Sequence, residues 1–271
     1  MRDDDWPDYL SDYHDERPGI TERALECAAQ PPLGTPYDWL SAALPERLGR
    51  VLDVACGSAP LQPRLAARAK SYLGVDVSPA ELALARERGR GPVVLGDARE
   101  LPVAGASVDT VVVSMGLMLV RPFDAALSEI ARVLRPGGRA GFLLPTSGPL
   151  RPADVRPLLA LAWRLHGPGS MPQRITERRF VRAASRCGLQ TVRASRHRFT
   201  FPLATRADAA GAVRSLYTPG RTDAQRRAAE RALARLARPG RALPLPLLRL
   251  IATKAPDDPG IDHTGEQRRK P

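Results

Sequence analysis

The chain has 271 residues, of which 43% are hydrophobic, and a formal net charge of +12. This length suits one large α/β domain, and no apolar run is long enough to span a membrane, so no membrane partner is expected. The acidic start of the chain does not resemble a secretory signal. Its three cysteines are widely spaced without a C-x-x-C pair, which argues against a disulfide framework or metal site and predicts a cytoplasmic protein.

The positive charge is concentrated in the second half of the chain. Residues 174–249 contain 18 arginines and four acidic residues. The chain is rich in Ala, Arg and Pro, a usage that a GC-rich genome produces without selection for binding. No basic stripe is interleaved with aromatic residues, as a single-strand binder would require. A nucleic-acid partner is therefore not favoured, whereas an acidic partner stays open.

Short apolar strands alternate with amphipathic helices in the first half. After two helices around 8–16 and 20–29, strands are predicted at 51–54, 72–77, 93–96, 110–114 and 140–144, with helices at 61–69, 79–88 and 123–134 between them. Ser78 is the expected N-cap of the helix over 79–88, with Pro79 at its first position. This order predicts a parallel sheet covered by helices.

The second half is less regular. A helix over 176–187 precedes a strand within 189–201, two helices at 204–217 and 223–238, and a late strand at 246–254. Helices inserted before the last strand would form a lid over the carboxyl edge of the sheet, where ligands bind in such folds.

The loop after the first strand reads "VLDVACGSAP" over 51–60. It lacks both the G-x-G-x-x-G pattern of a dinucleotide loop and the Gly-Lys-Ser/Thr of a P-loop. Asp53 would repel a pyrophosphate and suit a positively charged ligand. Asp76, at the end of the second strand, is placed to accept from ribose hydroxyls, and Asp97, after the third, to accept from an adenine amino group.

Four segments in chain order resemble a known family. They are "VLDVACGSAP", "YLGVDVSPAELALAR", "VLGDARELPVAGASVDTVVVSMGLM" and "ALSEIARVLRPGGRAGFLLP". Together they resemble successive motifs of class I S-adenosylmethionine-dependent methyltransferases of the small-molecule, type 11-like kind. The resemblance implies a Rossmann-like, seven-stranded, mostly parallel sheet with an antiparallel last strand. The expected units are an N-terminal helical cap (1–47), the cofactor-binding domain (48–200 and 243–255), a helical lid insertion (201–242) and a polar tail (256–271).

The resemblance also implies the contacts of the S-adenosylmethionine cofactor. By matching positions, Asp53, Ala55 and Gly57 would hold its methionine part, and Asp76 and Val77 its ribose. Asp97 and Ala98 would hold the adenine, and Ser114 and Met115 would lie near the sulfonium. Where the family often has a third glycine, this chain has Ala59. An alanine there costs nothing in a helical conformation but strains the loop in a left-handed one, which would weaken the expectation of catalysis.

Candidate residues for catalysis and substrate binding come mainly from the N-terminal segment. N-terminal helices in this family commonly fold over the cofactor, which would bring Tyr13, His14 and Arg17 to the site, with His14 as a general base. A solvated helix residue is the alternative for His14. Tyr37 could contact the substrate, and Met118 could line its pocket or start a core helix. His166, His197 and His263 are expected to be structural or exposed.

The leading hypothesis is an enzyme that methylates an O, N or C nucleophile of a small, partly apolar molecule, possibly in natural product biosynthesis. One alternative is a methyltransferase whose substrate is tethered to an acidic carrier protein that docks on the Arg-rich segment 174–249. A third is an RNA-binding or non-catalytic S-adenosylmethionine-binding protein. The methyl acceptor and the oligomeric state are left open by the sequence.

Overall fold

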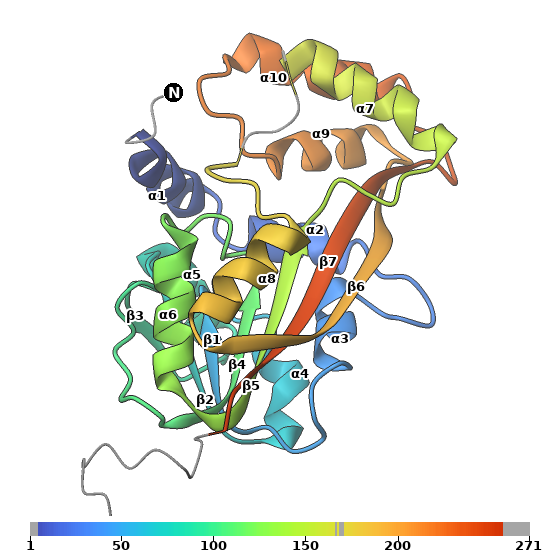
Figure 1. The fold of residues 1–271 in the computed structure, drawn as a ribbon. Coiled ribbons are helices and arrows are strands. Elements are labelled where there is room, and N and C mark those ends of the chain that lie inside the picture. The colour runs from blue at the N-terminus through green and yellow to red at the C-terminus, as the bar shows by residue number, and fades with distance from the viewer. Residues whose placement is uncertain (1–4, 166, 168–170, 257–271) are drawn as a thin grey trace, which may run out of the picture.

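A computed structural model describes residues 5–165, 167 and 171–256 of the chain (Figure 1). Its centre is a seven-stranded sheet of order β3-β2-β1-β4-β5-β7-β6, in which β1 to β5 are parallel and β7 is antiparallel to both neighbours. This confirms the predicted α/β class, with its antiparallel last strand. The strands are β1 (Gly49–Val54), β2 (Ala69–Asp76), β3 (Val93–Leu95), β4 (Val108–Ser114), β5 (Leu134–Pro145), β6 (Leu189–Pro202) and β7 (Ala242–Lys254).

Helices cover both faces of the sheet and bury its apolar side chains. On one face, α6 (Phe123–Val133) and α8 (Glu177–Arg186) pack on β4 and β5. There the Phe142 and Phe180 rings meet edge to face with centroids 4.8 Å apart. The other face is covered by α3 (Pro36–Ser41), α4 (Gln62–Leu65) and α5 (Pro79–Glu87).

The N-terminal segment forms α1 (Trp6–Glu16) and α2 (Ile20–Glu26), so the second predicted helix ends earlier than expected. The predicted helix over 61–69 is also shorter: α4 continues only as the 3-10 turn Ala66–Arg68. The reason is that Ala69 is already extended, with φ −91° and ψ 137°, because β2 begins there. Ser78 caps α5 as predicted, accepting a hydrogen bond from the Glu81 N–H at 3.3 Å.

Three helices form a separate layer above the carboxyl edge of the sheet: α7 (Pro152–Leu165), α9 (Arg206–Arg214) and α10 (Asp223–Ala234) (Figure 1). Sequence analysis anticipated α9 and α10 but not α7, which begins at Pro152 and contains Pro157. The layer has its own small core, which includes Leu165, Leu203, Ala209, Ala212, Val213, Ala229, Leu233 and Leu243. A buried ion pair from Arg198 Nε to Asp154 Oδ2, 2.8 Å long, ties α7 to β6.

None of the helices in the described part of the chain is long and apolar enough to cross a membrane. Of the predicted tail over 256–271, residues 257–271 lie outside the described residues, as do His166 and His263.

Candidate active site

The loop after β1 is held between the carboxyl ends of its neighbours. The Cys56 N–H donates to the Val75 carbonyl at 3.1 Å, which joins the loop to β2. The Asp76 carboxylate then accepts two backbone hydrogen bonds, from the Gly57 N–H at 2.7 Å and the Ser78 N–H at 2.9 Å. Burial raises the pKa of Asp76, although these two donors oppose the shift. Asp76 therefore both organises the loop and presents a carboxylate at this edge.

Left-handed backbone is concentrated at the same edge. Ala55, Ala59 and Met115 have φ values of 53°, 52° and 59°, and each costs roughly 1 kcal/mol because of its Cβ. Ala59 is left-handed and its methyl is fully buried, so the loop carries the strain that sequence analysis expected to weaken the case for catalysis. Three such residues gathered at the ends of β1 and β4 indicate a conformation that the surrounding contacts impose, as is common at functional sites.

Asp53 is almost completely buried, with 1% of its surface exposed. Its Oδ2 accepts from the Tyr72 hydroxyl at 2.8 Å, while its Oδ1 has no partner among the described residues. Burial raises the pKa of Asp53 to about 7, although the Tyr72 hydrogen bond opposes the shift. The buried Ser114 Oγ, at the end of β4, also has no partner within the described part of the chain. Polar atoms left open like these fit a ligand that brings hydrogen-bond donors and positive charge.

The ends of β2 and β3 combine exposed apolar surface with a carboxylate. Val77 and Leu95 are 65% and 61% exposed although both are apolar. Asp97, two residues after Leu95, forms an ion pair with Arg99, whose Nη2 lies 2.6 Å from Oδ2. This ion pair holds the pKa of Asp97 below its usual range. Ala98 is buried. A flat ring with an amino group, such as adenine, could cover the apolar side chains of Val77 and Leu95, and its amino group could donate to the Asp97 carboxylate.

Comparison with known proteins agrees with this geometry. Residues 52–142 match the family described as a methyltransferase domain. Over these residues the chain is similar to a methyltransferase domain. The match contains the loop after β1, Asp76, Asp97 and the end of β4, which are the parts that the structure brings together.

Curated relatives resemble the methyltransferase domain but not the whole chain. A demethylmenaquinone methyltransferase of Mycobacterium sp. (strain KMS) is 46% identical over 101 residues, which is 36% of this chain and 44% of that protein. A ubiquinone/menaquinone biosynthesis C-methyltransferase of Rubrivivax gelatinosus is 38% identical over 99 residues, 36% of this chain and 39% of that protein. The chain therefore matches less than half the length of these relatives.

Solved structures share the fold at low sequence identity. A Haloferax volcanii protein in complex with a methyltransferase activator has a TM-score of 0.58 at 18% identity, with 91% of this chain and 97% of that chain covered. The cyclase SpnF has a TM-score of 0.52 at 22% identity, with coverages of 81% and 80%. Because a protein titled a cyclase shares the fold, the fold alone does not specify the reaction.

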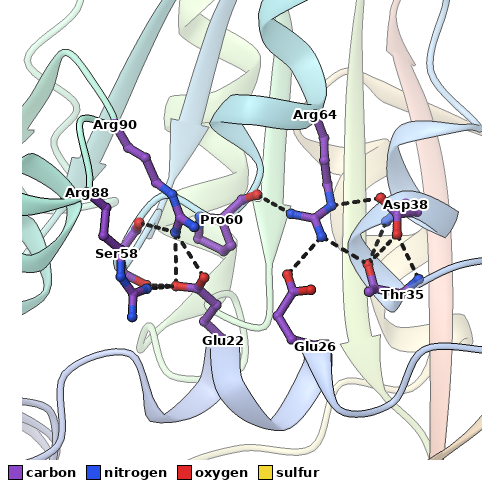
Figure 2. Close-up of polar contacts among 9 residues, drawn as sticks. All are labelled: Glu22, Glu26, Thr35, Asp38, Ser58, Pro60, Arg64, Arg88 and Arg90. Atoms are coloured by element: carbon purple, nitrogen blue, oxygen red, sulfur yellow. Dashed lines mark hydrogen bonds and ion pairs between the residues drawn. The ribbon is translucent and has the colours of Figure 1, made fainter.

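Helix α2 is joined to the loop after β1 by hydrogen bonds and ion pairs (Figure 2). Glu22 of α2 accepts from the Ser58 hydroxyl at 2.5 Å and from Arg90 at 3.0 Å, and it also pairs with Arg88. One turn later, Arg64 joins Glu26 at 2.8 Å to the Pro60 carbonyl at 2.8 Å. Since Ser58 and Pro60 belong to the loop, these contacts fix α2 and the loop to each other.

His14 lies in a chain of polar contacts between three segments. Its Nδ1 is 3.0 Å from Glu81 Oε1, and its Nε2 is 3.1 Å from the Tyr217 hydroxyl. The buried Glu81 also accepts from the Gly19 N–H at 3.0 Å, and a Cβ built on Gly57 would lie 3.6 Å from Glu81 Oε2. His14 is thus near the loop after β1, and it is not a solvated helix residue, since 17% of its side chain is exposed. Sequence analysis gave no role to Glu81, Tyr217 or Leu95.

The other predicted substrate residues are distributed differently. Tyr13 is buried, donates to the Arg214 carbonyl at 2.8 Å and supports the Arg17 guanidinium 5.1 Å above its ring. Tyr37 and Met118 are 2% and 3% exposed and lie in the two main cores, where no ligand reaches them without repacking. Tyr13 and Arg17 therefore belong to the cap beside the site, whereas Tyr37 and Met118 pack the domain.

Gly116 provides a direct test of the close contact between the β1 and β4 loops. A Cβ at this position would collide with the Cβ of Ala55. We expect Gly116→Ala to lower the free energy of unfolding by about 2 kcal/mol, as overpacking does, and Ala55→Gly in the same chain to recover most of that loss, measured by denaturant unfolding. Ala106→Gly, which relieves a left-handed alanine elsewhere, is the control and should not rescue Gly116→Ala. Equal recovery by both glycines would contradict the contact.

Proposed function

We propose that this protein transfers a methyl group from S-adenosylmethionine to an O, N or C nucleophile of a small, partly apolar molecule. The observation that carries the proposal is the assembly of Asp53, the strained loop and Asp76 at one sheet edge, with a buried acceptor left open at Asp53 Oδ1. The family match, which covers this edge, supports the same reaction class.

The chain's own residues would hold the cofactor in three groups. The Asp76 carboxylate suits the ribose hydroxyls, and the open oxygens of Asp53 and Ser114 suit the ammonium end and its surroundings. Val77 and Leu95 would cover the adenine ring beside Asp97. When bound, S-adenosylmethionine supplies a methyl carbon activated by a sulfonium. The protein contributes mainly alignment of the acceptor with that carbon.

The contact between His14 and Glu81 suits proton removal from the acceptor. The Glu81 carboxylate, 3.0 Å from Nδ1, holds the imidazole in one orientation, as in other carboxylate–histidine pairs. Nε2 then faces Tyr217, whose hydroxyl would pass the proton or be displaced by the acceptor. Burial raises the pKa of Tyr217, so its hydroxyl stays protonated and acts as a donor.

Demethylated quinols are the first acceptors to test, since two of the relatives are named for quinone methylation. Transfer of a labelled methyl group from S-adenosylmethionine to a short-chain demethylmenaquinol should be measurable above the no-enzyme rate. A panel of phenols, amines and carbon acids tests the wider class. Tight cofactor binding without transfer to any acceptor of the panel would favour the non-catalytic alternative.

A second candidate, a carrier-tethered substrate, is favoured by the surface of α8. Four arginines of this helix and Thr176 line a hollow of about 270 Å³: Arg178, Arg179, Arg182 and Arg186. Such a surface suits an acidic protein. Turnover of a carrier-borne acceptor that falls steeply with salt and with Arg182→Glu, while turnover of the free acceptor is unchanged, would support this candidate.

Removing the imidazole tests the proposed base. We expect His14→Ala to lower kcat by about 100-fold with an acceptor that must lose a proton, because general bases contribute roughly that factor or more. The matched control is His197→Ala, on β6, which should leave kcat unchanged. If His14→Ala changes the cofactor affinity but not kcat, His14 is a structural part of the cap.

A further inference from the structure

The outer face of α7 carries an apolar stripe exposed to solvent. Val155, Leu159 and Trp163 are 52%, 63% and 78% exposed, and their spacing of four residues places them on one side of the helix. The opposite side of α7 is buried, at Asp154, Pro157 and Leu165. The exposed stripe is therefore not needed for packing within the three-helix layer.

Trp163 distinguishes this stripe from scattered surface apolar residues. Trp6 and Trp39 are buried, at 7% and 6%, whereas Trp163 is largely exposed. Together with Leu159, Arg156, Ala160 and Ala162 it lines a hollow of about 600 Å³. An exposed tryptophan between an apolar surface and arginines is the composition of helices that lie in a membrane interface, because the indole has both an apolar body and a polar N–H.

The helix that packs against α7, α10, carries an exposed basic row. Arg227, Arg231 and Arg235 are exposed and also spaced by four residues, on the side of α10 opposite the buried Ala229 and Leu233. On α7 itself, Arg156 and Arg164 are exposed. The acidic residues of α10 are Asp223, which pairs with Arg226 at 2.7 Å, and Glu230. Arginine thus predominates along this face.

The two helices lie together at one end of the molecule, with α9 between them and the sheet (Figure 1). We propose that this face, made by the outer sides of α7 and α10, docks on the surface of an anionic lipid bilayer. Leu159 and Trp163 would enter the boundary between headgroups and acyl chains, and the arginines would contact lipid phosphates. An anionic surface suits this composition, because Arg156 lines the same hollow as Leu159 and Trp163.

This surface contact differs from the spanning segment that sequence analysis looked for. The proposal departs from the expectation of no membrane partner, which rested on the lack of a spanning run, because adsorption needs only an exposed apolar stripe and matching charge. The inference goes beyond methyl transfer, because it concerns residues of α7 and α10 that are not part of the proposed active site. Docking would place the three-helix layer against the lipid. Tyr217 follows α9, a helix of this layer, in the chain.

Vesicle flotation of the full chain tests the proposal. We expect at least about tenfold more binding to vesicles of phosphatidylcholine with phosphatidylglycerol than to phosphatidylcholine alone, lost in high salt. Fluorescence should shift to the blue on binding, and Trp163→Phe should remove that shift while the buried tryptophans remain. Leu159→Asp should reduce binding at least about tenfold. The matched control, Val192→Asp, places the same charge at an apolar residue 53% exposed on β6 and should bind normally.

Several outcomes would overturn the docking proposal. These are equal binding to both kinds of vesicle, binding that Leu159→Asp leaves intact, or no binding to either. If vesicles do not bind but sedimentation shows a dimer that Leu159→Asp dissociates, the face is an interface between two copies of the chain, and the proposal is wrong. Cofactor affinity of Leu159→Asp, measured by calorimetry, separates this result from a failure of the proposed function, because that affinity should be unchanged.

Discussion

Replacing Asp76 by alanine should lower the affinity for S-adenosylmethionine by at least about 100-fold, because two charge-assisted hydrogen bonds to the ribose would be lost. A second effect acts in the same direction: Asp76 also holds the Gly57 and Ser78 amides, so the free loop loses its order. Titration calorimetry of the purified chain measures the change. Asp76→Asn, which keeps one acceptor oxygen, should fall between the wild type and Asp76→Ala.

The matched control for Asp76 is Glu87→Ala, which removes an exposed carboxylate from the end of the neighbouring helix α5. It should bind the cofactor as the wild type does. Thermal unfolding of each variant checks that the fold is retained. Undiminished affinity in a folded Asp76→Ala would refute both the cofactor assignment and the family-based placement of the ribose.

The second prediction concerns the stability of the ligand-free protein. Because the pKa of Asp53 rises from 3.8 to about 7 in the fold, burial favours its protonated form. The contribution of the protonated Asp53 carboxyl to the free energy of unfolding is fully present below pH 3.8 and is lost as the pH rises through 7. The shift corresponds to about 4 kcal/mol of unfolding free energy across this window. The raised pKa of Asp76 acts in the same direction.

Asp53→Asn isolates this contribution, because asparagine has nearly the same shape and cannot ionise. Between pH 4 and 8, the free energy of unfolding of the wild type should fall by about 4 kcal/mol relative to that of Asp53→Asn, measured by urea unfolding. Acids with lowered pKa, such as Asp97 and Asp154, lose their stabilisation mainly below this range and cancel in the comparison. A difference independent of pH would show that Asp53 is ionised in the fold throughout.

Much of the sheet and its cofactor edge could be predicted from local sequence. Asp53, Asp76 and Asp97 each follow a short apolar strand, and parallel strands bring their carboxyl ends to one edge, so the meeting of Asp53 and Asp76 followed from order alone. Within β5, which begins earlier than the predicted strand at 140–144, Gly137 has a φ of 74°, a conformation that favours glycine. Such features depend on a few neighbouring residues.

Other parts of the site depend on contacts that no local pattern contains. His14 and Tyr217 are 203 positions apart, and Glu81 belongs to a third segment. Tyr37 and Met118 looked like possible substrate contacts, but an aromatic or a methionine near a strand is equally suited to a core, and burial by distant helices decided for the core. The helix α7 formed in spite of its prolines because its inner side closes the core of the three-helix layer.

The amino-acid sequence by itself determined the order of strands and helices, the acids at the strand ends and the resemblance of residues 52–142 to a methyltransferase domain, since these depend on local periodicity, turn residues and spacing. Tertiary structure alone decided the backbone of Ala59. Its φ of 52° occurs in a loop that is hydrogen-bonded to Val75, Asp76 and Glu22 at once. An alanine in the sequence does not predict this conformation. The same holds for the exposed face of α7: among the described residues, the buried positions of that helix lie on its opposite side.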